Sequence, residues 1–265
     1  MSILNEIAQR TKERIEEQKF KVPLRELAAQ QNSESAKKAA EKTSFLEALK
    51  KPGMSYICEV KKASPSKGLI AADFPYLDIA RDYEQAGASA ISCLTEPFYF
   101  QGADRYLQEI SQTVNIPVLR KDFTVDEYMI YQAKAFGASA VLLICAILDN
   151  SQLKAFGELA QDLGLDALVE THDEWEMDRA LNLEAKIVGV NNRNLHDFTI
   201  DMGNSLRLRS MAPADTVFVS ESGIKTAEDI RILYENEVDA VLIGESLMRS
   251  TDKKAALAAL NEKIQ

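Results

Sequence analysis

Residues 136–141 (FGASAV) nearly repeat residues 86–91 (AGASAI), and looser copies recur at residues 163–168 (LGLDAL) and 237–242 (EVDAVL). In each copy a helical pattern ends in a short turn, and a continuous apolar run follows it. A glycine after a helix supplies the left-handed cap residue, and an uninterrupted apolar run is what a strand buried on both faces requires. The repeat therefore predicts helices that alternate with parallel strands.

Apolar runs of this kind recur roughly every twenty to thirty-five residues, which is the length of one strand and helix unit. The runs end near Glu59, Thr95, Lys121, Ile144, Glu170, Asn191, Ser220 and Gly244. Eight such units predict an α/β fold, a (β/α)8 TIM barrel, whose chemistry lies at the carboxyl ends of its strands. We expect a single TIM-barrel domain over residues 1–265, with a helical extension over 1–50 and the barrel over 54–265.

The first 50 residues carry helical rather than strand periodicity. Ile3, Leu4 and Ile7 fall at three- and four-residue steps, and no strand pattern occurs in this segment. We expect the extension to cover one end of the barrel or to pack on its side. Residues 30–42 are rich in Ser, Lys, Ala and Glu, which predicts a mobile or solvated stretch.

Composition narrows the possible functions. Lys and Arg number 31 against 41 Asp and Glu, so the net charge of −10 disfavours nucleic acid as a partner. No apolar stretch is long enough for a membrane span, and the first residues lack the layout of a secretory signal, which favours the cytoplasm. Cys58, Cys93 and Cys145 lie in or beside apolar runs without metal-ligand spacing, as core residues do.

Two capping-box patterns, each a hydroxyl residue followed three positions later by glutamate, begin at Thr124 and Thr171. Helices that start there follow Lys121 and Glu170 within a few residues. Both reactive side chains are therefore expected at the carboxyl ends of their strands, on the rim where barrel enzymes do their chemistry.

Charged residues at the predicted strand ends are candidates for catalysis. Glu59 and Lys61 alternate onto the confined inward face, where they form either a substrate-binding pair or a rim salt bridge without a catalytic role. Lys121 is expected to be desolvated and near other cations, which would lower its pKa and suit a general acid or a Schiff-base nucleophile. Glu170 is the candidate for the complementary base.

Further polar residues follow the later strands. Asn191 could orient a hydroxyl or carbonyl and Arg193 could bind a carboxylate, although loop hydrogen bonding would also account for them. His172 is interpreted as a surface histidine of a first helical turn, and His196 is given no role.

The last two runs end in glycine-containing turns. Loops at these places in TIM barrels often cradle phosphate with backbone N–H groups, here those of Ser222, Gly223, Gly244 and Glu245. Because a carboxylate repels phosphate, Glu245 suits this site only if its side chain turns outward.

The chain carries, in order, EVKKASPS at 59–66, LTE at 94–96 with FQG at 100–102, KDF at 121–123, Glu170, NNRNL at 191–195, ESGI at 221–224 and GESLM at 244–248. Together these motifs resemble those of the indole-3-glycerol-phosphate synthase family of tryptophan biosynthesis. The resemblance implies the ring closure of 1-(2-carboxyphenylamino)-1-deoxyribulose 5-phosphate, with loss of carbon dioxide and water. It also implies that the reaction uses no metal and no cofactor.

The same resemblance assigns roles to residues. Lys121 corresponds to the general acid that protonates the substrate's ketone oxygen, and Glu170 to the group that assists proton removal. Glu59 and Asn191 would position the reacting groups. The remaining substrate contacts that we expect are Lys61 and Arg193 for the anionic groups, Ser64, Glu221, and the apolar walls Phe100, Phe123 and Leu142 around the anthranilate ring.

Two alternatives stay open at this point. One is another phosphate-binding barrel, an isomerase or a Schiff-base aldolase that uses Lys121, and the other is a non-catalytic metabolite-binding barrel. For partners we expect a small phosphorylated substrate, no nucleic acid and no membrane. We also expect a monomer, with contact to other tryptophan-pathway enzymes left open, as is the division of proton transfers between Lys61 and Lys121.

Overall fold

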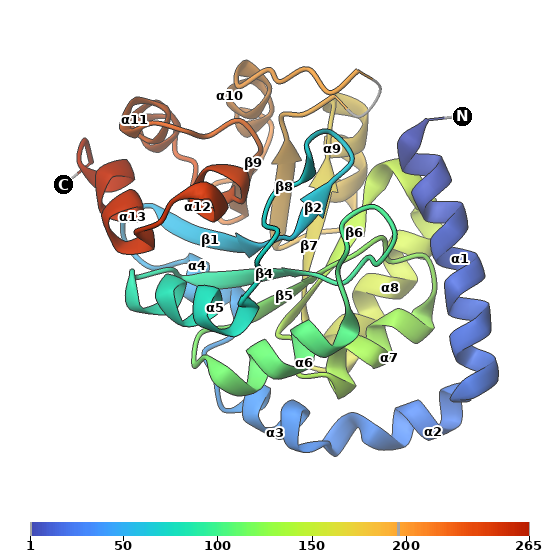
Figure 1. The fold of residues 1–265 in the computed structure, drawn as a ribbon. Helices are drawn as coiled ribbons and strands as arrows, with labels where there is room; N and C mark the ends of the chain where they lie inside the picture. The colour runs from blue at the N-terminus through green and yellow to red at the C-terminus, as the bar shows by residue number, and fades with distance from the viewer. Residues whose placement is uncertain (1, 195–196, 265) are drawn as a thin grey trace.

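The computed structural model describes residues 2–194 and 197–264, so His196 lies outside the described residues. Within these residues eight parallel strands close into a barrel, in the order β1-β10-β9-β8-β7-β6-β5-β4 (Figure 1). The strands are β1 (Ser55–Val60), β4 (Ala90–Leu94), β5 (Val118–Lys121), β6 (Ala140–Ile144), β7 (Asp166–Thr171), β8 (Ile187–Asn191), β9 (Val217–Glu221) and β10 (Ala240–Ile243). This arrangement confirms the predicted TIM barrel.

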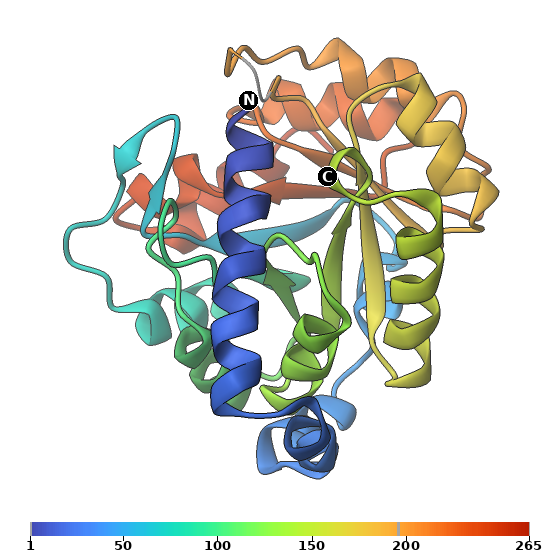
Figure 2. The same cartoon turned by 90° about the vertical axis from the view of Figure 1, so that its right-hand side faces the viewer.

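Helices surround the barrel and bury their apolar faces against it (Figures 1 and 2). They are α5 (Tyr76–Gln85), α6 (Asp104–Thr113), α7 (Glu127–Ala135), α8 (Asn150–Asp162), α9 (Glu174–Asn182), α10 (Gly203–Arg209), α11 (Ala227–Glu235), α12 (Glu245–Arg249) and α13 (Lys253–Asn261). A short hairpin of β2 (Ala63–Ser64) and β3 (Gly68–Leu69) follows β1. None of the helices among the described residues is both long and apolar enough to cross a membrane.

The register of the strands brings their carboxyl ends to one rim. Lys121 of β5 lies opposite Leu94 of β4, and Asn191 of β8 lies opposite Glu221 of β9. Glu170 of β7 pairs with Ile144, the last residue of β6. Polar side chains at the ends of separate strands therefore meet at the same edge of the barrel.

The extension contains α1 (Ile3–Lys21), α2 (Leu24–Ala28), α3 (Glu34–Ala40) and α4 (Phe45–Leu49). Figure 2 shows α1 running along one side of the barrel. At the opposite end of the extension, the fully buried Phe45 and Leu49 pack with residues that begin strands, among them Ala90 and Ala240. The two expected placements are therefore both realised, because α1 packs on the side and α4 closes the amino end of the barrel.

The predicted mobile or solvated stretch at residues 30–42 is wrong for one face of a helix, although residues 30, 32, 34, 37, 40 and 41 are exposed. It contains α3, whose Ser35, Ala36 and Ala39 are buried. The side-chain amide of Gln112 donates to the Ser35 hydroxyl at 2.8 Å and joins this helix to α6. Small side chains allow two helices to approach closely, so a composition poor in large apolar residues did not indicate exposure here.

The predicted capping boxes at Thr124 and Thr171 are also wrong. Helix α7 is capped by Asp126, which accepts the backbone N–H of Tyr128, and α9 by Asp173. Thr171 is the last residue of β7 and is buried. In both loops an aspartate two residues further on caps the helix instead. The helices still start close behind their strands, so Lys121 and Glu170 keep their places on the rim.

Candidate active site

A cavity of about 330 Å³ opens at the carboxyl ends of the strands. Ile3, Leu4 and Ile7 of α1 form part of its wall. Every residue that the sequence placed in the site lines this cavity: Glu59, Lys61, Ser64, Phe100, Lys121, Phe123, Leu142, Glu170, Asn191, Arg193, Glu221, Ser222, Gly223, Gly244 and Glu245. Its size suits a small molecule, and its wall combines apolar side chains with converging polar groups.

Lys121 lies at the centre of the polar groups, between two carboxylates. Its Nζ is 2.8 Å from Glu170 Oε2 and 2.7 Å from Glu221 Oε2. Burial alone would lower the pKa of Lys121, but the charges of Glu170 and Glu221 raise it well above the ordinary value. The lowered pKa expected from the sequence is therefore wrong, because carboxylates and not cations surround this amine. Lys121 is an ammonium ion at neutral pH.

The two carboxyl groups beside Lys121 differ in their proton affinity. For Glu170, burial acts to raise the pKa, but Lys121 and His172 hold it below the ordinary value. For Glu221, burial dominates and raises the pKa to about 7. One carboxyl is thus ionised and its neighbour is poised to gain or lose a proton near neutral pH, an arrangement typical of acid-base catalysis.

Glu221 was expected only as a substrate contact. The structure places it as close to Lys121 as Glu170 is, so the sequence missed half of the charge arrangement around the amine. Glu221 is the last residue of β9 and pairs with Asn191 of β8, and this position at a strand end could have indicated that it lies beside the other site residues. Within residues 2–194 and 197–264, the buried Glu221 Oε1 has no hydrogen-bond partner.

Glu59 and Lys61 form an ion pair at the end of β1, with Glu59 only 4% exposed. The pair lies against Gly244, which follows β10. A Cβ at position 244 would collide with the Glu59 carboxylate and come within 2.9 Å of Lys61 Nζ. Gly244 therefore gives this ion pair the space it occupies in the cavity wall.

Asn191 connects Glu170 to the loop that follows β8. Its Nδ2 donates to Glu170 Oε1 at 3.3 Å, and its Oδ1 accepts the backbone N–H of Arg193 at 3.1 Å. The Arg193 guanidinium donates to the Phe198 carbonyl at 3.2 Å and also lines the cavity. Both residues thus combine loop hydrogen bonding with a position in the site.

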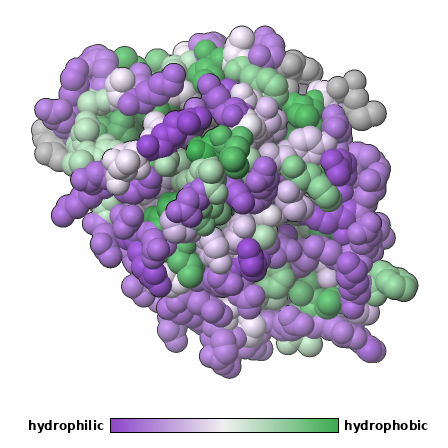
Figure 3. Space-filling view, in the orientation of Figure 1, coloured by the Kyte–Doolittle hydropathy of each residue, from purple (hydrophilic) through white to green (hydrophobic). Residues whose placement is uncertain are grey.

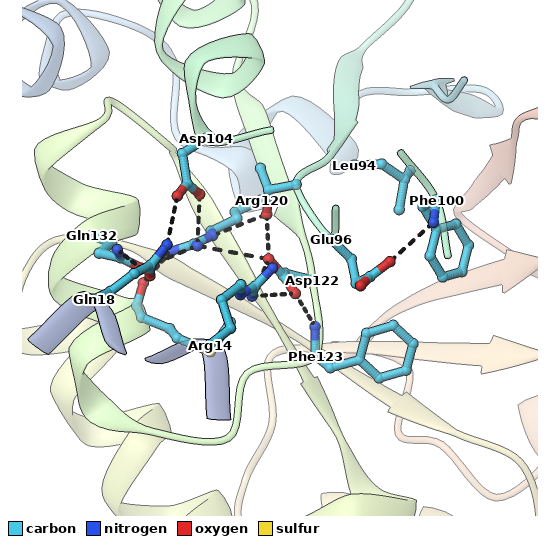
Figure 4. Close-up of polar contacts among 12 residues, drawn as sticks. Arg14, Gln18, Leu94, Glu96, Phe100, Asp104, Arg120, Asp122, Phe123 and Gln132 are labelled. Carbon is cyan, nitrogen blue, oxygen red and sulfur yellow. Dashed lines mark hydrogen bonds and ion pairs between the residues drawn. The ribbon is translucent and has the colours of Figure 1, made fainter. Parts of the chain in front are cut away.

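Phe100, Phe123 and Leu142 form an apolar part of the wall. The ring centroids of Phe100 and Phe123 are 6.1 Å apart, with an interplanar angle of 41°. Glu96 fixes the first ring by accepting the Phe100 backbone N–H at 3.0 Å, a contact visible in Figure 4. Flat apolar surfaces of this kind suit an aromatic ring.

Asp122, between Lys121 and Phe123, is fully buried and ties α1 to the site (Figure 4). Arg14 of α1 donates to both of its carboxylate oxygens, at 3.0 and 2.9 Å. The Thr95 hydroxyl donates to Asp122 at 2.6 Å, and the Phe123 backbone N–H donates at 2.8 Å. Burial would raise the pKa of Asp122, but the guanidinium groups of Arg14 and Arg120 lower it.

Arg120 extends this network behind β5. It is 1% exposed and donates to Asp104 at 2.9 Å and to the Gln132 side chain at 3.2 Å (Figure 4). Arg120 lies inside the run that ends near Lys121, as the next-to-last residue of β5. The partners of Arg14 and Arg120 lie far away in sequence or on neighbouring helices, so no local pattern indicated them.

The two glycine-containing turns lie beside each other on the rim. Ser222 and Gly223 adopt positive φ values of 67° and 92°, and Gly244 is the N-cap of α12. The Glu245 carboxylate points to Arg249, with its Oε1 3.2 Å from Arg249 Nε. Lys67 Nζ lies 4.0 Å from the same oxygen, and both cations line the cavity together with Glu245. The outward turn of this side chain, which a phosphate cradle requires, stays a prediction.

His172 is not the surface residue that the sequence predicted. Its side chain is 18% exposed and lies between the carboxylates of Glu170 and Glu176. It immediately follows β7 and precedes the cap of α9, so the buried end of the strand holds it in the interior. Among the described residues, no three His, Cys, Asp or Glu side chains form an arrangement that could hold a metal ion.

Comparisons with known proteins agree with one another on the family to which this chain is similar. A family model described as "Indole-3-glycerol phosphate synthase" matches residues 4–260. The chain is 53% identical over 260 residues to the indole-3-glycerol phosphate synthase of Ruminiclostridium cellulolyticum, covering 97% of this chain and 98% of the relative. It is 52% identical over 264 residues to that of Endomicrobium trichonymphae, covering 98% and 100%. A solved 3-hexulose-6-phosphate synthase shares the fold, with a TM-score of 0.64 at 16% identity over 79% of this chain and 99% of that one.

Proposed function

The chain belongs to the indole-3-glycerol phosphate synthase family, and from this premise we propose how the residues of its cavity divide the work of the reaction. The protein is a carboxy-lyase of tryptophan biosynthesis and acts on a small phosphorylated substrate. It converts 1-(2-carboxyphenylamino)-1-deoxyribulose 5-phosphate to indole-3-glycerol phosphate, releasing carbon dioxide and water.

Lys121 is the general acid of the ring closure. As the ring carbon that bears the carboxylate attacks the ketone carbon, the ammonium group gives its proton to the ketone oxygen, which becomes a hydroxyl. The support for this role is that Lys121 is charged, buried and held by two carboxylates from separate strands. An ammonium donor in a site that excludes water stabilises the developing oxyanion strongly.

Loss of carbon dioxide leaves the pair of electrons needed to restore the aromatic ring. The new hydroxyl takes a second proton from Lys121, which Glu221 has recharged, and departs as water, while Glu170, the ionised carboxylate, accepts the proton whose removal completes the indole. Glu221, with its pKa raised to about 7 by burial, exchanges a proton with Lys121 between these steps. Glu59 and Asn191 keep the reacting groups in place.

The anionic ends of the substrate are held by separate parts of the wall. Lys61 and Arg193 bind anionic groups, and the backbone N–H groups of Ser222, Gly223, Gly244 and Glu245 receive the phosphate. Ser64 positions the substrate from the hairpin after β1. Phe100, Phe123 and Leu142 enclose the anthranilate ring. The support for this division is that all of these residues line one cavity.

The observation that carries the proposal is the contact of Lys121 with both Glu170 and Glu221. A Schiff-base aldolase needs a neutral amine, and the raised pKa of Lys121 argues against one. The direct test adds the substrate and follows indole fluorescence. Turnover without a borohydride-trapped lysine adduct supports general acid catalysis, and a trapped adduct at Lys121 would contradict it.

We propose further that the extension and the barrel form one domain. The chain works as a monomer in the cytoplasm, and its contacts with other tryptophan-pathway enzymes would be transient. The Arg14–Asp122 pair between α1 and the barrel supports one domain. Polar side chains cover most of the face shown in Figure 3, with small apolar areas between them, which supports a monomer. Cys58, Cys93 and Cys145 are unpaired, as is usual in the cytoplasm. Sedimentation equilibrium measures the oligomeric state.

A further inference from the structure

The ring of His172 lies between two carboxylates that approach its two different nitrogens. Its Nδ1 is 3.0 Å from Glu176 Oε2, and its Nε2 is 3.5 Å from Glu170 Oε1. A neutral imidazole has one N–H donor and one acceptor nitrogen, so either neutral tautomer turns a lone pair toward a carboxylate. Only the imidazolium ion presents a proton to both carboxylates.

Glu176 fixes the ring from the side away from the cavity. Its Oε2 also accepts the His172 backbone N–H at 2.8 Å, so the carboxylate clamps both the main chain and the ring of one residue. The Glu176 backbone N–H donates in turn to Asp173 Oδ1, the cap of α9, at 2.9 Å. The start of α9 thus holds the imidazole in one orientation.

On the cavity side, the other partners of Glu170 are Lys121 on Oε2 and Asn191 on Oε1. Among the described residues the buried His172 Nε2 has no hydrogen-bond partner, and Glu170 Oε1 lies 3.5 Å from it. When Lys121 turns its proton to the substrate, Glu170 loses part of its contact with a cation. An imidazolium at His172 would remain beside it.

We propose that His172 is a positioning residue that acts as an imidazolium ion and keeps the Glu170 carboxylate ionised and correctly oriented during the reaction. The inference rests on the proposed role of Glu170 as the proton acceptor. It adds a charged residue behind that carboxylate, outside the set that lines the main cavity.

The surroundings of His172 favour the charged form. Glu170 of β7, Glu221 of β9 and Glu176 of α9 act on its charge. The other charged groups that line the same pocket are Asp173, Arg193, Asp201 and Arg207. Arg207 is already paired with Glu174 at 2.7 Å. Burial would lower the pKa of His172, but the hydrogen bond to Glu176 and the charge of Glu170 raise it above the ordinary value.

The raised pKa of His172 determines how kcat should depend on pH. A histidine with a raised pKa is charged at low pH, and its contribution is lost as the pH rises through that raised value. The charged form supports Glu170, so kcat should fall on the alkaline side when His172 loses its proton. Replacing His172 with a residue that does not titrate should remove this limb from the pH profile.

The first test is direct, because the chain contains two histidines. Nitrogen-15 NMR of the imidazole rings, assigned by the signals that H172Q removes, reports the protonation of each nitrogen. We expect both nitrogens of His172 to be protonated at pH 7, with a midpoint above the ordinary value of about 6.5. In E170Q the proton affinity of His172 should fall about tenfold, because one of its two carboxylates is neutral. A neutral ring at pH 7, or a midpoint that E170Q does not move, would overturn the proposal.

The second test separates positioning from mere packing. H172A should lower kcat about tenfold with little change in KM, because it removes a group that acts in the proton-transfer step. H172Q should recover most of this loss at pH 7, since its amide can donate near the position of Nε2, and its alkaline limb should be absent. E176Q should lower the midpoint of the His172 titration. Loss of activity in H172Q equal to that in H172A, or an unchanged alkaline limb, contradicts the proposal.

The two proposals can fail separately. Full activity in E170Q would refute the role of Glu170 and with it the purpose assigned to His172. An inactive E170Q together with a neutral His172 would leave the role of Glu170 standing and overturn the inference about the histidine alone.

Discussion

Replacing Arg14 with methionine should weaken the attachment of the N-terminal helix α1 to the end of β5 and lower the stability of the protein. Arg14 is 10% exposed in its side chain and its partner Asp122 is fully buried. Removing one member of a buried ion pair typically costs about 3–5 kcal/mol, because the remaining charge is left without its partner. Here Thr95, the Phe123 N–H and Arg120, at 3.7 Å, still contact Asp122. We therefore expect a smaller loss of stability, about 2–3 kcal/mol, at or just below the lower limit of that range.

Urea unfolding at pH 7, followed by circular dichroism, measures this loss as a lower midpoint with an unchanged slope. In a thermal scan it should lower the melting temperature by about 4–12 °C, given about 2–4 °C for each kcal/mol in a chain of this size. The matched control is K19M. Lys19 lies on the same helix and pairs with Asp126 at 2.7 Å, but both side chains are about 30% exposed, so its loss should cost no more than about 1 kcal/mol.

Adding D122N to R14M should restore part of the stability, because a neutral amide is less costly to bury than an unpaired carboxylate. KM should rise in R14M, since Asp122 orients the Phe123 main chain beside Lys121. A loss in R14M no larger than that in K19M would refute the view that this buried pair joins the extension to the site.

Three further predictions concern the rim of the barrel. E221Q should remove a pH dependence of stability. Burial raises the Glu221 pKa to about 7, so the folded wild type binds this proton more tightly than the unfolded chain does. As the pH rises from about 4.5 to 7, the free energy of unfolding of the wild type should therefore fall by up to about 3 kcal/mol relative to that of E221Q. Urea titrations of both proteins at several pH values measure this, and parallel curves would contradict it. G244A should lower kcat/KM at least about tenfold, because a Cβ there meets the Glu59 carboxylate. The control G157A, which has open space around it in α8, should keep wild-type kinetics. Equal activity of the two variants would count against the role of Gly244. Borohydride added during turnover should leave the mass of the protein unchanged, and an adduct on Lys121 would favour Schiff-base chemistry.

The barrel and the charged or polar residues at its strand ends could be predicted from local patterns in the sequence. Ser64, Glu221, Phe100, Phe123 and Leu142 were expected in the site only because of the family resemblance. The glycine turns before β4 and β6 mark where strands begin, and Lys121, Glu170 and Asn191 lie at or next to the ends of apolar runs. A closed barrel then brings those ends together without any further information. Placing these residues at one rim therefore required only the strand periodicity and the topology.

The electrostatics of the site could not be predicted in the same way. The pKa of Lys121 depends on which charges lie within a few ångströms, and the sequence did not reveal that Glu221 as well as Glu170 contacts it. Arg14 and Asp122 are 108 residues apart, so no periodic signal connects them. The capping residues Asp126 and Asp173 were missed because a threonine two residues earlier stands three positions before a glutamate, as in a capping box. Where each helix begins depends on how the end of the preceding strand packs.

The central claim is that Lys121, held as an ammonium ion by Glu170 and Glu221, protonates the substrate in the ring closure. Single-turnover indole fluorescence with K121A, combined with calorimetric binding of the substrate, tests it most directly. We expect K121A to be a folded protein that still binds the phosphorylated substrate but has lost nearly all turnover. Turnover at the wild-type rate in K121A would contradict it.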